Sequence, residues 1–134
     1  MATRRTPIVA GNWKMNLDAA KARALATAVA SRSGEARGVD LVLCPPALYA
    51  GAVAEAIDLS QGRSPSGVAL GGQNCHDKES GAFTGEVAPG MLRDVGCAFC
   101  ILGHSERRSL FGETDAVVNA KVKAVLAAGL TPIV

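Results

Sequence analysis

The sequence has only a small net charge and contains no long apolar run. Each of these absences excludes a class of protein. Fourteen basic and twelve acidic side chains leave a net charge of +2 over 134 residues, so no basic surplus suggests nucleic acid as a partner. No apolar run could span a bilayer, and residues 1–6 are not followed by the apolar core of a signal peptide. We therefore expect a cytoplasmic protein with no membrane and no nucleic acid among its partners.

The sequence contains one pair of cysteines at the spacing of metal ligands. Cys97 and Cys100 have the spacing of a metal-binding or redox pair, but residues three apart on a predicted strand face opposite sides of the sheet. No second Cys or His pair at ligand spacing accompanies them. We expect buried free thiols, no metal and no cofactor.

What the sequence does contain is an alternation of strand and helix patterns that repeats about every thirty residues. A hydrophobic content of 49% with 19% charged residues favours one packed domain spanning residues 1–134. Five apolar segments are predicted as strands: 7–12, 39–43, 68–74, 99–102 and 130–134. Such segments separated by helices indicate a parallel sheet covered by helices, an α/β fold. The pattern alone leaves two arrangements open, an open doubly wound sheet and part of a (β/α) barrel.

His104 lies between the fourth predicted strand and a predicted helix start. Gly103 permits a turn, Ser105 is the predicted N-cap, and Glu106 occupies the first turn, where the helix dipole favours an anion. An imidazole at this end of a helix is expected to stay neutral and to donate a hydrogen bond to an oxygen that gains negative charge. The alternative is a turn histidine that satisfies a backbone carbonyl.

Five stretches, taken in order, resemble one enzyme family. They are residues 10–16 (AGNWKMN), 71–74 (GGQN), 81–86 (GAFTGE), 101–108 (ILGHSERR) and 110–115 (LFGETD). They are similar to the N-terminal half of triosephosphate isomerase, and the similarity extends from about residue 7 to residue 134. The resemblance implies a partial (β/α)8 barrel with four βα units and the start of a fifth strand, because a complete barrel needs about 250 residues.

The resemblance also implies roles for four residues at the carboxyl ends of strands. Asn12 and Lys14 would bind a triose phosphate, with Lys14 attracting the phosphate. His104 would act as the electrophile at the carbonyl oxygens, and Glu106 would support it by pairing with Lys14. For the residues taken singly, the alternatives are a solvated surface lysine and an ordinary acid in a first helical turn.

Other parts of the family's site have no counterpart in these residues. The general base of the family is a glutamate in a Glu-Pro stretch after the sixth strand, which also begins the mobile lid, and the glycine-rich phosphate loops follow later. We therefore expect the chain alone to be inactive in interconverting dihydroxyacetone phosphate and D-glyceraldehyde 3-phosphate, a step of glycolysis and gluconeogenesis. The alternatives are a non-catalytic, self-assembling half-barrel and a small-ligand-binding open α/β sheet.

Two observations predict a homo-oligomer. The resemblance implies that loop 75–87 docks into a partner subunit with Phe83 and Thr84 near its tip, so we expect Phe83 to be buried between chains or against a neighbouring element. A partial barrel would also have two free strand edges and bare barrel-facing side chains. The residues that could lie on either face of the sheet are Val9, Leu41, Leu43 and Ile101.

Overall fold

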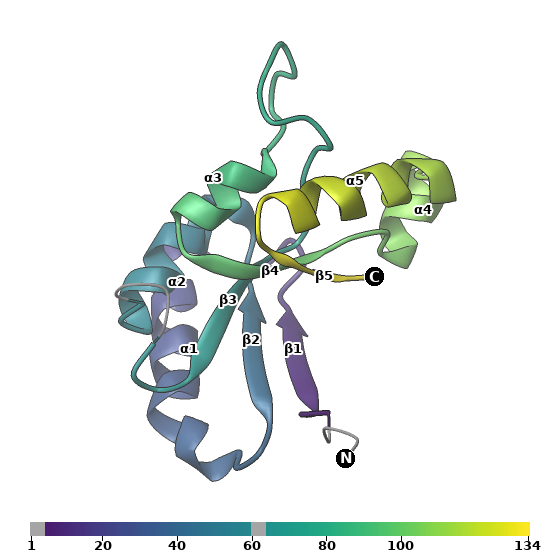
Figure 1. Cartoon of the computed structure of the whole chain (residues 1–134). Helices are drawn as coiled ribbons and strands as arrows, with labels where there is room; N and C mark the ends of the chain where they lie inside the picture. The colour runs from purple at the N-terminus through teal and green to yellow at the C-terminus, as the bar shows by residue number, and fades with distance from the viewer. Residues whose placement is uncertain (1–4, 60–63) are drawn as a thin grey trace.

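The computed structural model describes residues 5–59 and 64–134 and contains one curled parallel sheet (Figure 1). Its strands are β1 (Ile8–Asn12), β2 (Asp40–Cys44), β3 (Val68–Gly72), β4 (Cys97–Ile101) and β5 (Thr131–Ile133). They lie side by side in chain order, which confirms the five predicted strands. An open doubly wound sheet would reverse its strand order at a switch point. The uninterrupted order excludes that alternative and fits a partial barrel.

Within residues 5–59 and 64–134, five helices connect or flank these strands. They are α1 (Ala19–Arg32), α2 (Ala50–Ala56), α3 (Pro89–Asp94), α4 (Ser105–Phe111) and α5 (Asp115–Ala127), with short 3-10 turns at Ser33–Glu35 and Ala47–Tyr49. The side chain of Asp18 caps α1 by accepting from the Lys21 N–H, and Thr114 caps α5 by accepting from the Val117 N–H. Gly129 follows α5 with φ 78°, the left-handed conformation that a residue in this position commonly adopts. Residues that favour a helix start and a helix end therefore stand at the two ends of α5.

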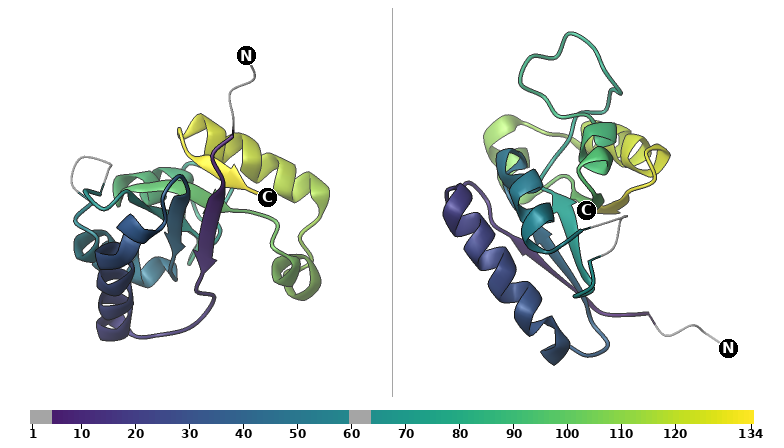
Figure 2. Two further views of the ribbon diagram at one scale, coloured as in Figure 1. Left: turned by 90° about the horizontal axis from the view of Figure 1, so that it is seen from below. Right: turned by 90° about the vertical axis from the view of Figure 1, so that its left-hand side faces the viewer.

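Helices α1, α2, α3 and α5 lie on the outer face of the sheet, whereas α4 projects beyond the end of β4, as the two turned views show (Figure 2). On this face, buried strand residues such as Leu43 and Leu70 share one core with Ala26, Val53 and Val125 of the helices. At roughly 25 cal/mol per Å² of apolar area removed from water, contacts of this kind supply the main stabilising term. The helices are thus held by every second residue of each strand, the residues that point outward. The residues between them point to the inner face and are apolar as well.

The inner face is less exposed than the sequence led us to expect. Val42 and Cys44 are 1% and 0% exposed, and with Ile101 they form a second cluster. The expectation that the barrel-facing side chains would all be bare is therefore wrong. The sheet curls, so residues of neighbouring strands cover one another without a second half.

The four residues left unassigned between the faces can now be placed. Ile101 belongs to the inner cluster, whereas Leu41 and Leu43 pack in the helix-covered core. Val9 is paired with Leu41 in the sheet register and so shares its outward side, yet it is 59% exposed. Within the described residues, β1 and β5 each pair with one strand only, so both edges of the sheet are free.

Two consecutive glycines end β3 because neither position has room for a side chain. A Cβ on Gly71 would lie 2.7 Å from Cys44 Sγ, and one on Gly72 would lie 2.6 Å from Leu92 Cδ1. Gly71 therefore permits close packing on the inner face and Gly72 permits close packing against α3. No helix in the described part of the chain is long and apolar enough to cross a membrane.

Replacing Gly71 by alanine tests this packing. We expect Gly71→Ala to lower the free energy of unfolding by about 1–3 kcal/mol, because the added methyl group must displace Cys44. Gly51→Ala is the matched control, since a Cβ at Gly51 in α2 meets nothing within 4 Å and alanine is the better helix former. Urea unfolding should show opposite signs for the two variants; equal stabilities would contradict the packing.

Candidate active site

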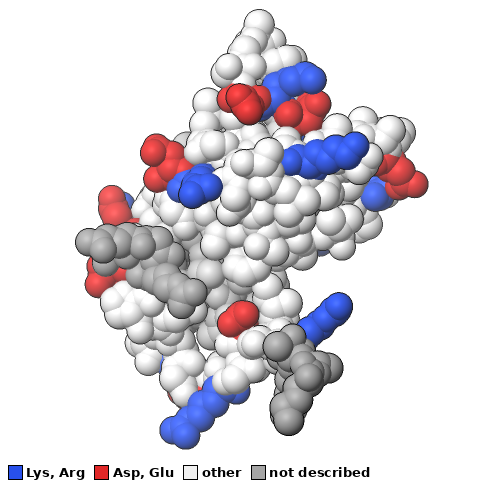
Figure 3. Space-filling view, viewed as in Figure 1, with Lys and Arg blue, Asp and Glu red and all other residues white. Residues whose placement is uncertain are grey.

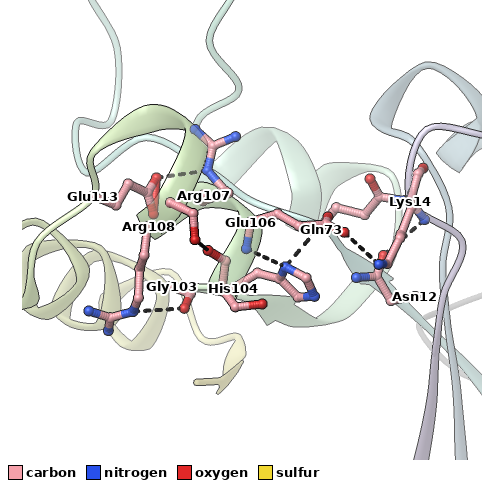
Figure 4. Close-up of polar contacts among 11 residues, drawn as sticks. Asn12, Lys14, Gln73, Gly103, His104, Glu106, Arg107, Arg108 and Glu113 are labelled. Carbon is pink, nitrogen blue, oxygen red and sulfur yellow. Dashed lines mark hydrogen bonds and ion pairs between the residues drawn. The ribbon is translucent and has the colours of Figure 1, made fainter.

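The candidate site lies where β1, β3 and β4 end, at one rim of the sheet. Asn12 is the last residue of β1, Gln73 follows β3, and His104 stands three residues beyond β4. The chain therefore brings together all four residues predicted for catalysis or substrate binding, with Lys14 and Glu106 in direct contact (Figure 4). The carboxyl ends of parallel strands meet at the same edge, which is why residues 92 positions apart can pair.

The loop after β1 is held in an unusual conformation. Lys14 has φ 55°, a left-handed value that is uncommon for any residue other than glycine. Its backbone N–H donates to Asn12 Oδ1 at 3.0 Å, and its carbonyl oxygen accepts from Gln73 Nε2 at 2.8 Å. Asn16 Nδ2 donates to the carbonyl of Trp13 at 2.8 Å. Trp13 itself packs against the core, so side-chain bonds and packing fix the loop.

His104 is the N-cap of α4, and Ser105 is the first helical residue. The prediction of Ser105 as the cap is wrong by one position, because the imidazole replaces a hydroxyl as the acceptor. His104 Nδ1 accepts from the backbone N–H of Glu106 at 3.2 Å, although it also lies 3.6 Å from Glu106 Oε2. The backbone N–H is the nearer of the two groups, and it needs a lone pair on Nδ1 to accept its proton. Nδ1 is then unprotonated, and Nε2 of a neutral ring carries the proton.

Glu106 links the lysine to the histidine. Its Oε1 lies 2.5 Å from Lys14 Nζ, and the side chains of the pair are about half exposed. The hydrogen bond from Lys14 lowers the pKa of Glu106 more than burial raises it. Solvent screening leaves such a pair little effect on stability, so its main effect is to orient the ammonium. Glu106 therefore pairs with Lys14 while it occupies the first turn of α4, so the two predictions made for this residue are compatible.

A second, buried ion cluster joins the candidate site to the centre of the fold. Glu113 Oε2 accepts from Lys121 Nζ and from Arg107 Nε, each at 2.7 Å, and Lys121 also donates to Asn74 Oδ1 at 2.9 Å. The side chains of Lys121 and Glu113 are 8% and 6% exposed. Burial raises the pKa of Glu113, but the bonds from Lys121 and Arg107 outweigh it and hold the pKa below its usual value. Glu113 is therefore ionised inside the protein.

Sequence reasoning missed this cluster, although one signal was present. Lys121 stands on the apolar face of α5 between Val118 and Val125, where a lysine without a partner would be costly. The partner, Glu113, lies in the connection between α4 and α5, and the turn there brings its carboxylate to the lysine.

The loop of residues 75–87 extends away from the site and has no helix or strand of its own (Figures 1 and 2). Phe83 stacks on His76 with ring centroids 4.2 Å apart but remains 41% exposed. The expected burial of Phe83 against a neighbouring element of the same chain is thus incomplete. Thr84 is also exposed, and the structure does not bring either residue to the candidate site of its own chain. Burial between chains stays a prediction.

The four cysteines are free and buried. Burial raises the pKa of the Cys97 thiol to about 12 and that of Cys44 to about 11, so both are protonated and unreactive at neutral pH. The described residues contain no cluster of three or more His, Cys, Asp or Glu side chains placed to hold a metal ion. The polar groups that meet at the candidate site are the Lys14 ammonium, the Asn12 and Gln73 amides and the His104 imidazole (Figure 4).

This set of groups can stabilise negative charge that develops on an oxygen next to a carbonyl carbon. The fold and the site define a (β/α)-barrel protein with its polar residues at the carboxyl ends of the strands. A family model described as triosephosphate isomerase matches residues 7–134. The chain belongs to the triosephosphate isomerase family.

Individual relatives agree with this assignment. The chain is 50% identical over 130 residues to the triosephosphate isomerase of Rhodopirellula baltica, which covers 97% of this chain and 49% of the relative. It is 52% identical over 129 residues to that of Symbiobacterium thermophilum, covering 96% and 48%. The crystal structure of triosephosphate isomerase from Bartonella henselae superposes with a TM-score of 0.79 at 38% identity, over 96% of this chain and 50% of that one. The chain therefore spans about half the length of these relatives.

The buried cluster yields a stability prediction. We expect Glu113→Gln to lower the free energy of unfolding by about 3–5 kcal/mol at pH 7, because Lys121 keeps a buried charge without its counter-charge. Glu55→Gln, which breaks the exposed pair with Arg23, is the matched control and should cost at most about 1 kcal/mol. Equal losses would show that burial does not govern this pair.

The same variant should change how stability depends on acid. Because the pKa of Glu113 is lowered in the folded chain, its stabilising effect is complete above the pKa of an unfolded glutamate and is lost as the pH falls through the folded value. Urea unfolding measured between pH 7 and pH 3 should therefore show a shallower loss for Glu113→Gln than for the unmodified chain.

Proposed function

We propose that this chain supplies the carbonyl-polarising and phosphate-attracting part of a triosephosphate isomerase site. His104 Nε2 would donate to the carbonyl oxygens of the triose phosphate while Lys14 attracts its phosphate and Asn12 supports the loop. The observation that carries the proposal is the hydrogen bond from Glu106 N–H to His104 Nδ1, since it leaves a neutral imidazole with its donor on the free side. No cofactor enters the proposal.

The remaining chemistry belongs to residues that these 134 do not include. Removal of a proton beside the carbonyl needs a general base, and the described site offers Glu106, which is engaged by Lys14, and no second carboxylate beside His104. Family members place the base, lid and phosphate loops in the half of the barrel that this chain does not match. We infer that the reaction, interconversion of dihydroxyacetone phosphate and D-glyceraldehyde 3-phosphate in the cytoplasm, requires both halves.

Activity should therefore depend on complementation. We expect the 134-residue chain alone to show no turnover above the uncatalysed rate in a coupled assay, and turnover to arise when the C-terminal half of the Symbiobacterium thermophilum relative is co-expressed with it. In that mixture His104→Gln should lower kcat by about 10²–10⁴-fold, whereas Lys123→Gln, an exposed change on α5, should not. Turnover by the pure chain that is lost in His104→Gln would refute the division of labour.

We also infer that the chain associates with copies of itself. Ile8 and Val9 on the free edge of β1 are 46% and 59% exposed, and unpaired parallel edges invite pairing with another chain. Phe83, at 41% exposure on an extended loop, offers a second contact. These observations favour the self-assembling half-barrel as the state of the isolated chain, alongside its catalytic role in a completed barrel.

Light scattering after size exclusion tests the association. We expect a mass above that of one chain that falls on dilution, and a lower apparent association for Val9→Lys, because a charge on an edge strand opposes pairing. Lys123→Gln should behave like the unmodified chain. A concentration-independent monomer would show that the curled sheet needs no second copy.

A further inference from the structure

The proposed function assigns no role to residues 71–74, although they lie beside the candidate site. Residues 71–74 (GGQN) end the middle strand of the sheet, and the two glycines are explained by packing alone. Gln73 and Asn74 follow the strand, and their side chains bond in different directions. Asn74 accepts from Lys121 in the buried cluster, and Gln73 turns toward the loop after β1 (Figure 4).

The carboxamide of Gln73 uses both of its protons on main-chain carbonyls. Nε2 donates to the carbonyl oxygen of Lys14 at 2.8 Å and to that of Cys44 at 2.9 Å. The Cys44 carbonyl also accepts from the backbone N–H of Trp13 at 3.1 Å. One amide therefore bridges the end of β2 to the loop after β1, across two chain segments some thirty and sixty residues distant from it.

Lys14 needs such support because its backbone is strained. A non-glycine residue at φ 55° occupies a sparsely populated conformation that persists only where its surroundings enforce it. Asn12 Oδ1 holds the N–H of Lys14 and Gln73 holds its carbonyl, so both ends of the residue are fixed. In this conformation the ammonium reaches Glu106, next to His104.

We propose that Gln73 is a positioning residue for Lys14: its carboxamide clamps the Lys14 and Cys44 carbonyls and thereby holds the ammonium in the mouth of the site. The inference deepens the proposed function, because Lys14 is the cation assigned there to the phosphate. It does not depend on turnover, since the Lys14–Glu106 pair is present in the chain without substrate. Failure of the clamp and failure of the isomerase proposal are thus separable.

The test reads the position of Lys14 through its partner. NMR titration of the Glu106 side-chain carboxyl gives its pKa in four chains: unmodified, Gln73→Met, Lys14→Met and Ser33→Ala. Methionine keeps the length of glutamine but cannot donate, and Lys14→Met sets the shift for complete loss of the pair. Ser33→Ala removes a side-chain bond to a backbone carbonyl far from the site and is the control for general destabilisation.

We expect Gln73→Met to raise the pKa of Glu106 by at least half the rise seen in Lys14→Met, and Ser33→Ala to leave it unchanged, in chains that are fully folded by circular dichroism. A Glu106 pKa in Gln73→Met equal to that of the unmodified chain would overturn the proposal and leave Gln73 a structural bond.

A second measurement on the unmodified chain decides the matter if Gln73→Met does not fold. Because both Nε2 protons are bonded, their hydrogen exchange should be at least tenfold slower than that of a free glutamine side chain. Exchange at the free rate would show that the clamp is not formed, and the proposal would be wrong.

Discussion

The site depends on the pairing of parallel strands whose carboxyl ends meet at one rim. This pairing places the ends of β1, β3 and β4 within side-chain reach, although Lys14 and Glu106 are 92 positions apart in the chain. The middle strand β3 contributes most, because its two glycines admit Cys44 on one side and Leu92 on the other. Gln73 and Asn74, which follow, then bond in two directions, one toward the loop of Lys14 and one toward Lys121 in the helix that begins at Asp115.

An ion pair or cluster lies on each of these two sides, and the two differ in burial. The pair of Lys14 and Glu106 is half exposed, so it orients a cation that must remain available and adds little stability. The cluster of Lys121, Glu113 and Arg107 is largely buried, so it costs desolvation and is strongly destabilised when one member is removed. The exposed pair belongs to the site that we propose for the triose phosphate, and the buried cluster joins Arg107 of α4 to Lys121 of α5 through Glu113. The space-filling view shows how sparse charge is over much of one face of the molecule (Figure 3).

Much of the fold could be predicted from the sequence because its signals are local. Apolar runs predicted all five strands. The N-cap of α4 was misplaced by one residue, since histidine rarely replaces a hydroxyl or carboxylate as a cap and only the hydrogen bond from Glu106 N–H identifies it. The four residues of the site were found through motifs whose spacing is constant in a family, so their proximity was an implication of resemblance rather than of the pattern itself.

The sequence by itself determined the alternation of strands and helices, the glycines at the end of β3 and the identity of the polar residues at strand ends, because these follow from side-chain size, periodicity and backbone preference. The tertiary structure decided three other things. The curl of the sheet buried Val42 and Cys44 on an inner face expected to be bare, the turn between α4 and α5 gave Lys121 its carboxylate, and Gln73 came to bond the carbonyl of Lys14, a residue in a left-handed conformation. The first and third depend on distances between segments far apart in the chain, and the second depends on how the turn sets one helix against the next. The linear sequence does not encode such distances in any local pattern.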